Sequence, residues 1–368
     1  YFQRDLDKAG ASFRAALAAD PDSVMALVNL GLVLKDSGRL QEALGHLRRA
    51  YELAPDAEGT LRSLVVTLIE ADQCEEARSV AAAAVERNPS GYEAHKYHGM
   101  AHQKLHDPVR ALACYDMALK MRADDAELHD YRGVAFLELG RLPQAIECYE
   151  RALALRPDFS LSAFHRALAR LQLADYRNGW DDYELRQLNQ DYLRRQDAYP
   201  DWDGSSLAGR TILIYREQGL GDEMMFASCL QQLIQAAGHC IIECEPRLQG
   251  IFRRSFPAAT IYASTPDGGL PREIVGRYID FSTSAGSIPR FLRRDLGDFP
   301  RHNGYLEADP ARVALWRERL SRLGPGLKVG VSWEGGVRKT RRALRSLPLD
   351  RWLPILQTPG ARFVSLQY

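Results

Sequence analysis

The sequence predicts an α-helical repeat superhelix followed by an α/β Rossmann-like domain. Three observations support this prediction: small residues that recur every 34 positions, a change to short apolar runs after about residue 205, and a glycine-containing loop behind the first of those runs. The 368 residues are enough for two or three domains with separate cores. The predicted boundaries are 1–186 for the repeats, 187–325 for a first α/β domain and 326–368 for the start of a second.

Composition excludes several classes of protein. Lys plus Arg and Asp plus Glu both total 48, and this balance argues against a general nucleic-acid binder, which carries a basic excess. No apolar run approaches the roughly 18 residues that span a bilayer, and no charged-then-apolar signal segment is found at the start. The six cysteines are too few for a disulfide scaffold. We therefore expect a cytoplasmic protein with reduced thiols and no membrane span.

Small residues recur at a period of 34 through the first half of the chain. One register holds Ala9, Ala43, Ala77, Ala111 and Ala145, and a second holds Ala16, Ala50, Ala84, Ala118 and Ala152. Prolines keep the same spacing at Pro21, Pro55, Pro89 and Pro157, with Ala123 in the missing place. Two short helices per repeat pack closely only where side chains are small. A proline ends the second helix because it has no N–H to donate.

Glycines and large side chains complete each repeat. Glycines fall on the predicted first helices at Gly31, Gly99 and Gly133, and in the turns at Gly38 and Gly140. Larger residues of the second helices fill the space beside them, at Phe13, Leu47, Tyr115 and Tyr149. The period and these residues resemble the tetratricopeptide repeat over about residues 4–186. The resemblance implies a superhelix whose concave face holds a protein or peptide.

The resemblance also places a partner-binding groove on the first helices. Its predicted residues are Asn29, Arg62, Lys96, Gln103, Asp130 and Glu138, with Val28, Leu32 and Lys35 beside the first. The alternative is that these are solvated helix positions. In the related array of O-GlcNAc transferases, an asparagine ladder grips the peptide backbone. Only Asn29 matches that ladder here, and the later rungs hold Ser63, Tyr97 and Tyr131.

Four histidines follow one another at helical spacing, at His95, His98, His102 and His106. The spacing predicts that they share one helix face. Neutral imidazoles four residues apart can ligate zinc or nickel. We favour the alternative that three occupy packing positions and the fourth lies near the turn, because no cysteine or carboxylate obviously completes a site. We therefore predict no metal site, and interpret Cys114 and Cys148 as one repeat position seen twice.

The end of the array is altered. The alanine register reaches Gly179, so Asp175 to Arg186 is predicted to be a modified last repeat. Trp180 and Tyr183 are expected to cap the open end of the stack against the next domain. A polar connector, about residues 187–205, then leads to Trp202-Asp203-Gly204.

Short β-rich runs follow the connector. Those expected to be strands of a parallel sheet, alternating with helices, are Thr211–Tyr215, Ile241–Glu243, Ala259–Tyr262 and Tyr278–Phe281. The first is followed by Glu217-Gln218-Gly219-Leu220-Gly221-Asp222. Ligands of such sheets bind at the carboxyl ends of the strands, where this loop falls. A helix N-cap is the alternative role for Asp222.

A second strand-and-loop pair lies near the end of the chain. Lys328 to Trp333 is predicted to be a strand, and Phe363 to Leu366 another, with a helical stretch at Trp352 to Leu356 between them. The loop after the first holds glycines and a basic cluster that includes Arg338, Lys339 and Arg345. Such a loop suits a phosphate or diphosphate, and a solvated basic loop is the alternative.

The chain contains a combination of several short motifs. They are Gly179-Trp180, Tyr183-Glu184 with Arg186, Trp202-Asp203-Gly204, Glu217 to Asp222, Gly330 to Trp333 and Ser365-Leu366-Gln367. Together they look like bacterial tetratricopeptide-repeat proteins fused to a GT-B glycosyltransferase. The match is to the heptosyltransferase-like family, with a layout similar to O-GlcNAc transferase. The resemblance implies transfer of a sugar from a nucleotide-sugar donor to an acceptor, without a cofactor or metal.

Roles for individual residues follow from this resemblance. It implies that Asp222 is the general base, with Glu217 and Glu223 as rivals. The donor would contact Gln218, Gly219, Gly221, Ser332, Trp333, Arg338, Lys339 and Arg345. A second GT-B half normally continues for well over a hundred residues, so we expect it to be only begun here and this chain alone to turn over little.

Three functions remain open at this point. In the first, a cytoplasmic glycosyltransferase modifies a protein held by the repeats. In the second, the acceptor is a lipid-linked or polysaccharide precursor. In the third, the chain is a non-catalytic adaptor with a degenerate GT-B domain.

Overall fold

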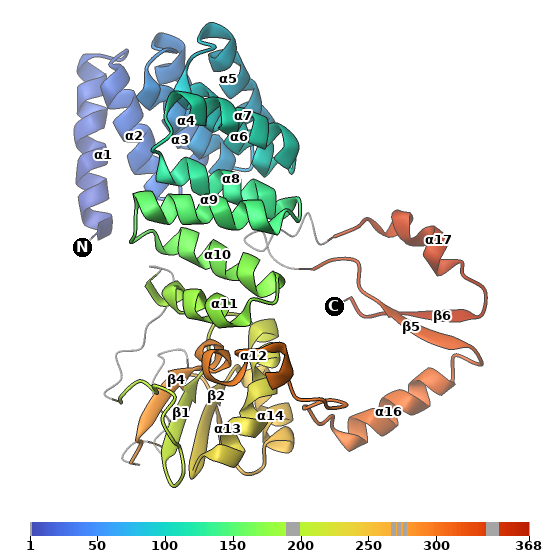
Figure 1. Cartoon of the computed structure of the whole chain (residues 1–368). Helices are drawn as coiled ribbons and strands as arrows, with labels where there is room; N and C mark the ends of the chain where they lie inside the picture. Colours follow the sequence, from blue (N-terminus) through green and yellow to red (C-terminus); the bar gives the residue numbers. More distant parts are fainter. Residues whose placement is uncertain are drawn as a thin grey trace. The chain divides into compact units, whose positions relative to one another are not determined.

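A computed structural model describes residues 2–188, 199–265, 270, 274, 278–335 and 346–367 (Figure 1). The chain forms two compact units, and neither is continuous in the sequence. One unit comprises Tyr1–Ala198 with Ser287–Pro300, and the other comprises Tyr199–Gly286 with Arg301–Tyr368. Across the described ranges, no helix is both long and apolar enough to cross a membrane.

The first unit is a stack of paired helices, drawn from blue to green in Figure 1. After α1 (Phe2–Ala19), the first helices of the repeats are α2 (Val24–Asp36), α4 (Glu58–Glu70), α6 (Tyr92–Lys104), α8 (Ala126–Glu138) and α10 (Ser160–Gln172). The second helices are α3 (Leu40–Leu53), α5 (Cys74–Arg87), α7 (Pro108–Met121), α9 (Leu142–Leu155) and α11 (Tyr176–Tyr183). Every helix in each series begins 34 residues after the one before it. The predicted helical repeat is confirmed.

The two helices of a repeat touch where a small residue faces a large one. A Cβ atom on Gly31 would lie 2.6 Å from Cγ of Leu47, and one on Gly133 would lie 2.5 Å from Cε1 of Tyr149. Both contacts are too short for any side chain on the glycine. The equivalent pairs along the array are Gly31 with Leu47, Val65 with Ala81, Gly99 with Tyr115, Gly133 with Tyr149 and Ala167 with Tyr183.

The turns between first and second helices share one backbone conformation. Residues with φ between 59° and 76° recur at Gly38, Asp72, His106, Gly140 and Ala174. This left-handed conformation favours glycine, because a Cβ atom crowds the following carbonyl oxygen. His106 therefore lies in a turn beyond α6 and does not share a helix face with the three histidines before it. The spacing alone was misleading because α6 ends at Lys104.

A small parallel sheet forms the core of the second unit. Its strands are β1 (Thr211–Tyr215), β2 (His239–Cys244), β3 (Thr260–Ala263) and β4 (Phe281–Ser284), in the order β3-β2-β1-β4. Helices α12 (Leu220–Phe226) and α13 (Leu230–Ala236) connect β1 to β2, and α14 (Gln249–Ser255) connects β2 to β3. β1 pairs on both sides, so its apolar residues Ile212, Leu213 and Ile214 are fully buried.

The fourth strand lies three residues beyond its predicted start. Tyr278 is 81% exposed and precedes the sheet. Asp280 marks the boundary, because its carboxylate accepts a hydrogen bond from the N–H of Thr211 at 2.8 Å. The connector before β1 pairs with this strand, since Trp202 N–H donates to the Ser282 carbonyl at 2.8 Å. The outer edge of β4 is thereby partly covered.

The remaining elements of this unit are shorter. Helix α16 (Pro310–Ser321) precedes β5 (Leu327–Val331), which pairs in parallel with β6 (Ala361–Ser365). Helix α17 (Leu353–Leu356) lies between these strands in the sequence, as predicted. Gly330 of β5 is packed beneath Leu366, whose Cδ1 atom would lie 2.6 Å from a Cβ at that position.

A double-mutant cycle tests the size matching within a repeat. Gly99→Val should destabilise the protein, because its side chain would collide with the ring of Tyr115. Adding Tyr115→Ala recreates the reversed pair Val65 with Ala81, so we expect a favourable coupling of about 1 kcal/mol or more in urea unfolding. Gly45→Val is the control partner, because a Cβ there meets open space. Purely additive costs for Gly99→Val and Tyr115→Ala would contradict size matching.

The turn conformation makes a second prediction. Ala174→Gly should raise the free energy of unfolding by about 0.5–1 kcal/mol, because the strain of the left-handed conformation is relieved. Ala113→Gly, the same change at an exposed position inside α7, should lower it by about 1 kcal/mol. Thermal unfolding of both variants measures this difference, and a loss of stability in both would show that Ala174 is unstrained.

Candidate functional site

The predicted groove residues lie on the first helices of the repeats and differ in exposure. Arg62 of α4 is exposed, whereas Asn29, Gln103 and Glu138 are half-buried. Lys96 of α6 and Asp130 of α8 are buried. A partner approaching this face would therefore meet Arg62 more readily than either buried residue.

Lys96 binds the next repeat. Its Nζ atom lies 2.9 Å from Oδ2 of Asp125 and 3.3 Å from Oε2 of Glu127. The same ammonium lies 5.9 Å from the ring centroids of both Tyr92 and Tyr131. Burial would raise the pKa of Asp125, but hydrogen bonds from Tyr92 and Lys96 lower it. Lys96 is thus an internal link between α6 and α8.

Two other groove residues are also engaged within the array. Oδ1 of Asp130 lies 3.0 Å from Nδ1 of His165, which joins α8 to α10. Oε1 of Gln103 accepts a hydrogen bond from the hydroxyl of Tyr115 at 2.7 Å. A partner would have to displace these contacts to use either side chain.

Three metal-ligating side chains meet between α6 and α7. They are His98, His102 and Cys114, and one ligand atom of each lies within 4.8 Å of the other two. The sequence interpretation considered the histidines without this cysteine. The signal that could have found it is an offset of 16 residues, which relates His98 to Cys114 just as it relates Gly99 to Tyr115.

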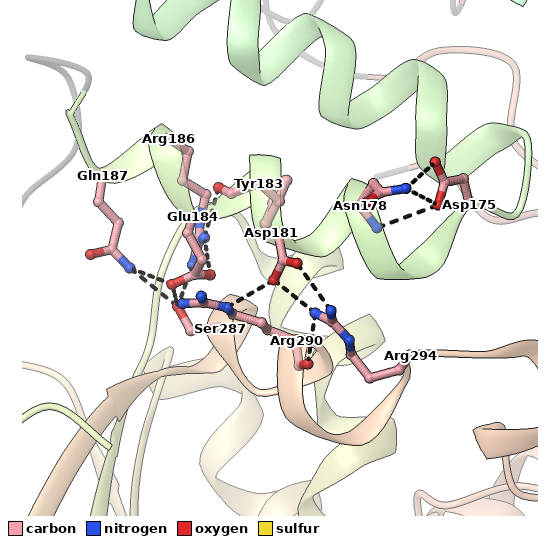
Figure 2. Close-up of polar contacts among 10 residues, drawn as sticks. All are labelled: Asp175, Asn178, Asp181, Tyr183, Glu184, Arg186, Gln187, Ser287, Arg290 and Arg294. Atoms are coloured by element: carbon pink, nitrogen blue, oxygen red, sulfur yellow. Dashed lines mark hydrogen bonds and ion pairs between the residues drawn. The ribbon is translucent and has the colours of Figure 1, made fainter. Parts of the chain in front are cut away.

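The last repeat is covered by Ser287–Pro300, a segment about a hundred residues later in the sequence. Figure 2 shows Asp181 of α11 between two arginines of this segment. The carboxylate accepts hydrogen bonds from Arg290 at 3.0 Å and from Arg294 at 2.7 Å and 3.0 Å. The hydrogen bond from Arg294 is the main cause of a lowered pKa at Asp181.

A second set of contacts lies beside the first. The hydroxyl of Ser287 donates to Glu184 at 2.9 Å and accepts from the buried Arg186 at 3.0 Å (Figure 2). Arg186 also lies over the ring of Tyr183, 4.4 Å from its centroid, and Tyr183 is buried. Trp180 meets Tyr183 edge-on with the ring centroids 5.6 Å apart. The predicted end-cap residue Tyr183 is thus linked to the docked segment through Arg186.

The loop after β1 differs from a simple glycine turn. The left-handed residue is Gln218, with φ of 60°, while Gly219 has φ of −100°. Asp222 accepts a hydrogen bond from the Gly219 N–H through Oδ2 at 3.0 Å, and its own N–H donates to the Gly219 carbonyl. A Cβ on Gly221 would meet open space. Asp222 therefore stabilises the first turn of α12 from its third position, while Gly219 and not Asp222 is the N-cap.

A buried network lies beside this loop. Glu223 is 3% exposed, pairs with Arg216 at 2.9 Å and accepts from the N–H of Glu245 at 2.8 Å. Burial raises the pKa of Glu223 against the effect of Arg216. Glu217 is buried as well. These residues follow β1 and β2, so the carboxyl end of the sheet is polar.

The predicted donor residues near β5 are only partly described. Ser332 is exposed and donates to Oε1 of Gln367 at 3.3 Å, and the carbonyl of Trp333 accepts from Leu347 at 2.9 Å. Arg338, Lys339 and Arg345 lie outside the described residues.

Comparison with known proteins identifies the repeats. Models of the tetratricopeptide repeat match residues 1–58, 64–126 and 131–159. Protein FlbA of Caulobacter vibrioides is 37% identical over 204 residues, which is 52% of this chain and 34% of FlbA. The chain thus spans about a third of that relative's length. The N-terminal half is a tetratricopeptide-repeat array, a fold that serves protein interaction.

Solved tetratricopeptide-repeat structures are similar in the same region. One, from Parabacteroides merdae, is 20% identical with a TM-score of 0.43, covering 49% of this chain and 72% of that one. Another, from Thermus thermophilus, is 22% identical with a TM-score of 0.42, covering 46% of this chain and 93% of that one.

Replacing each of two neighbouring aspartates in the last repeat should lower the free energy of unfolding by different amounts. Asp182 is 10% exposed and bonded to Arg166 and Arg170, so Asp182→Asn should cost about 3 kcal/mol by leaving buried charge unpaired. Asp181 is 42% exposed, so Asp181→Asn should cost only about 0.5 kcal/mol.

Urea unfolding at neutral pH measures both costs. Because the pKa of Asp181 is lowered in the folded state, its contribution is present above about pH 4 and is lost as the pH falls through the lowered pKa. Equal costs for the two variants at neutral pH would contradict this assignment.

Proposed function

We propose that this chain acts as a glycosyltransferase. In this proposal the repeats hold a protein acceptor, and a nucleotide-sugar donor binds at the carboxyl end of the four-stranded sheet. The repeat array supports the first part, because tetratricopeptide repeats present an extended face to protein partners. The exposed Arg62 and the half-buried Asn29 are the groove residues most open to such a partner.

The strand order is the observation that carries the second part. In the order β3-β2-β1-β4, the direction in which the sheet is built reverses between β1 and β4. Ligands of open parallel sheets bind outside the carboxyl ends of the strands at such a reversal. The loop from Glu217 to Gly221 directly follows β1 there. We therefore interpret the sheet as one Rossmann-like half of a GT-B enzyme.

The two glycines of the loop support a ligand at this place. Gly219 has an ordinary backbone conformation, and a side chain at Gly221 would meet open space. The fold thus does not require glycine at Gly221, whereas a Cβ at Gly219 would lie 3.3 Å from Oδ2 of Asp222. Their small size leaves the backbone open to close approach by a ligand, which is a frequent use of glycine.

Residues for the reaction remain proposals. Asp222 bonds Gly219 through one carboxylate oxygen, and the other oxygen is a chemically competent proton acceptor for an acceptor hydroxyl. Arg338, Lys339 and Arg345 would stabilise charge on the departing nucleotide diphosphate, together with donor contacts at Gln218, Ser332 and Trp333.

A non-catalytic adaptor is the second candidate. It is favoured by the structural role of Asp222 at the start of α12 and by the ion pair that engages Glu223. In an adaptor the sheet would serve only as a support, and partner binding by the repeats would be the whole function.

Thermal unfolding of the whole protein with a panel of nucleotide sugars separates the two candidates. A donor that binds the folded state raises the unfolding temperature by mass action. We expect Gly221→Val to leave the ligand-free unfolding temperature almost unchanged, because its side chain meets open space, and to remove the donor-induced shift. Gly45→Val, also open but on α3, should keep that shift.

The outcomes are distinct. No shift with any donor would refute the donor site and favour the adaptor. A shift that survives Gly221→Val would place the donor elsewhere on the chain.

A further inference from the structure

One repeat departs from the apolar packing of its neighbour. In the preceding repeat, the positions that face the second helix are Leu64 and Leu68 of α4, and both are fully buried. One period later, the equivalent positions of α6 are His98 and His102. Opposite them on α7 lies Cys114, where the preceding repeat has Val80. Three potential metal ligands therefore replace three apolar side chains at one packing site.

Their separations are close to those of a metal centre. The Nε2 atoms of His98 and His102 are 3.1 Å apart, and Sγ of Cys114 lies 3.7 Å from Nδ1 of His98. Bond lengths to tetrahedral zinc imply separations of about 3.3 Å between two nitrogens and about 3.6 Å between nitrogen and sulfur. The two distances involve different nitrogens of His98, and only one of these can bind a shared ion. With one ligand atom from each residue, all three atoms lie within 4.8 Å of one another, so the side chains must close in by rotation to share an ion.

Burial, and then the neighbouring His102, lower the pKa of His98 to about 4, so its imidazole is neutral at neutral pH. Burial raises the pKa of Cys114 to about 11, so a metal must displace the thiol proton in order to bind there. The other ionisable groups that act on these rings are Glu75, Arg78, His95, Asp107 and Arg110.

Asp107 supplies an outer contact. Its Oδ2 atom lies 3.9 Å from Nδ1 of His102, and its Oδ1 atom caps α7 by accepting from the N–H of Arg110 at 3.1 Å. This separation is too long for a hydrogen bond, but a carboxylate that accepts one from the second nitrogen of a ligating histidine orients the ring and increases its basicity. The helix cap holds this carboxylate in place.

We propose that His98, His102 and Cys114 bind a zinc ion that links α6 to α7. Two imidazoles and one thiolate select a borderline-soft ion such as zinc over magnesium or calcium. Binding forms a bond from each residue to the metal and releases the thiol proton of Cys114 to solvent. His98 and Cys114 are half-buried, and we assign the fourth coordination position to water.

Cobalt(II) is the probe, because a cobalt–thiolate bond gives an absorption band. Zinc added afterwards should displace the cobalt and remove that band. Titration of the chelator-treated whole protein should reach an endpoint at one equivalent with a thiolate charge-transfer band. Cys114→Ser should remove that band and weaken zinc binding by about tenfold or more. Cys148→Ser is the matched control, since Cys148 occupies the same place one repeat later beside Arg132, and it should bind like the parent.

A second variant controls for the possibility that Cys114→Ser loses metal binding only because it misfolds. His98→Leu/His102→Leu restores the leucines of the preceding repeat, so it should fold and yet show no rise in unfolding temperature with zinc. The parent should show such a rise.

The proposal is overturned if the parent shows no saturable binding. In that case the three residues form only a hydrogen-bonded chain through His98. It is also overturned if Cys114→Ser keeps the thiolate band or binds zinc as tightly as the parent.

Discussion

The array depends on close contact between the two helices of each repeat. That contact requires one small and one large residue at facing positions, and either helix can supply the small one. Gly31 faces Leu47, whereas Val65 and Ala81 reverse the sizes within one core. From α2 to α11, the turns and the helix starts also repeat at the same interval of 34 residues. A regular stack of helices follows.

A neighbouring packing site between the two helices, the one that holds His98, His102 and Cys114, carries different residue types in different repeats. Its three positions hold two leucines and a valine in the repeat α4–α5, and two histidines and a cysteine in the repeat α6–α7. In the last repeat, α10–α11, they hold two arginines and an aspartate. The residues at each site are chemically complementary. In the last repeat, for example, Arg166 and Arg170 donate hydrogen bonds of 2.8 Å to the carboxylate of Asp182. The last site stabilises the end of the array close to Asp181, where Ser287–Pro300 docks.

Periodic features were predictable from the sequence, and contacts between distant segments were not. The helices follow a repeated local pattern, so the array and its period of 34 residues were predicted. β1 is a continuous apolar run buried on both faces, and it was predicted with its observed bounds. The docking of Ser287–Pro300 depends on arginines that pair with Asp181 more than a hundred residues earlier, which no local pattern reveals. Cys114 was missed as a partner of His98 because the two lie on different helices. The role of Asp222 stayed open because a helix-capping aspartate and a catalytic one have the same local sequence.

The functional account joins a protein-binding array to a parallel sheet with a polar carboxyl end. Its most direct test is transfer itself. The whole protein would be incubated with nucleotide sugars and proteins from its own host, and intact mass spectrometry would search the proteins for added sugar. The account predicts sugar on a protein acceptor, and none when Arg62→Glu weakens capture by the repeats. Sugar found only on lipid or polysaccharide, or on no molecule at all, would contradict it.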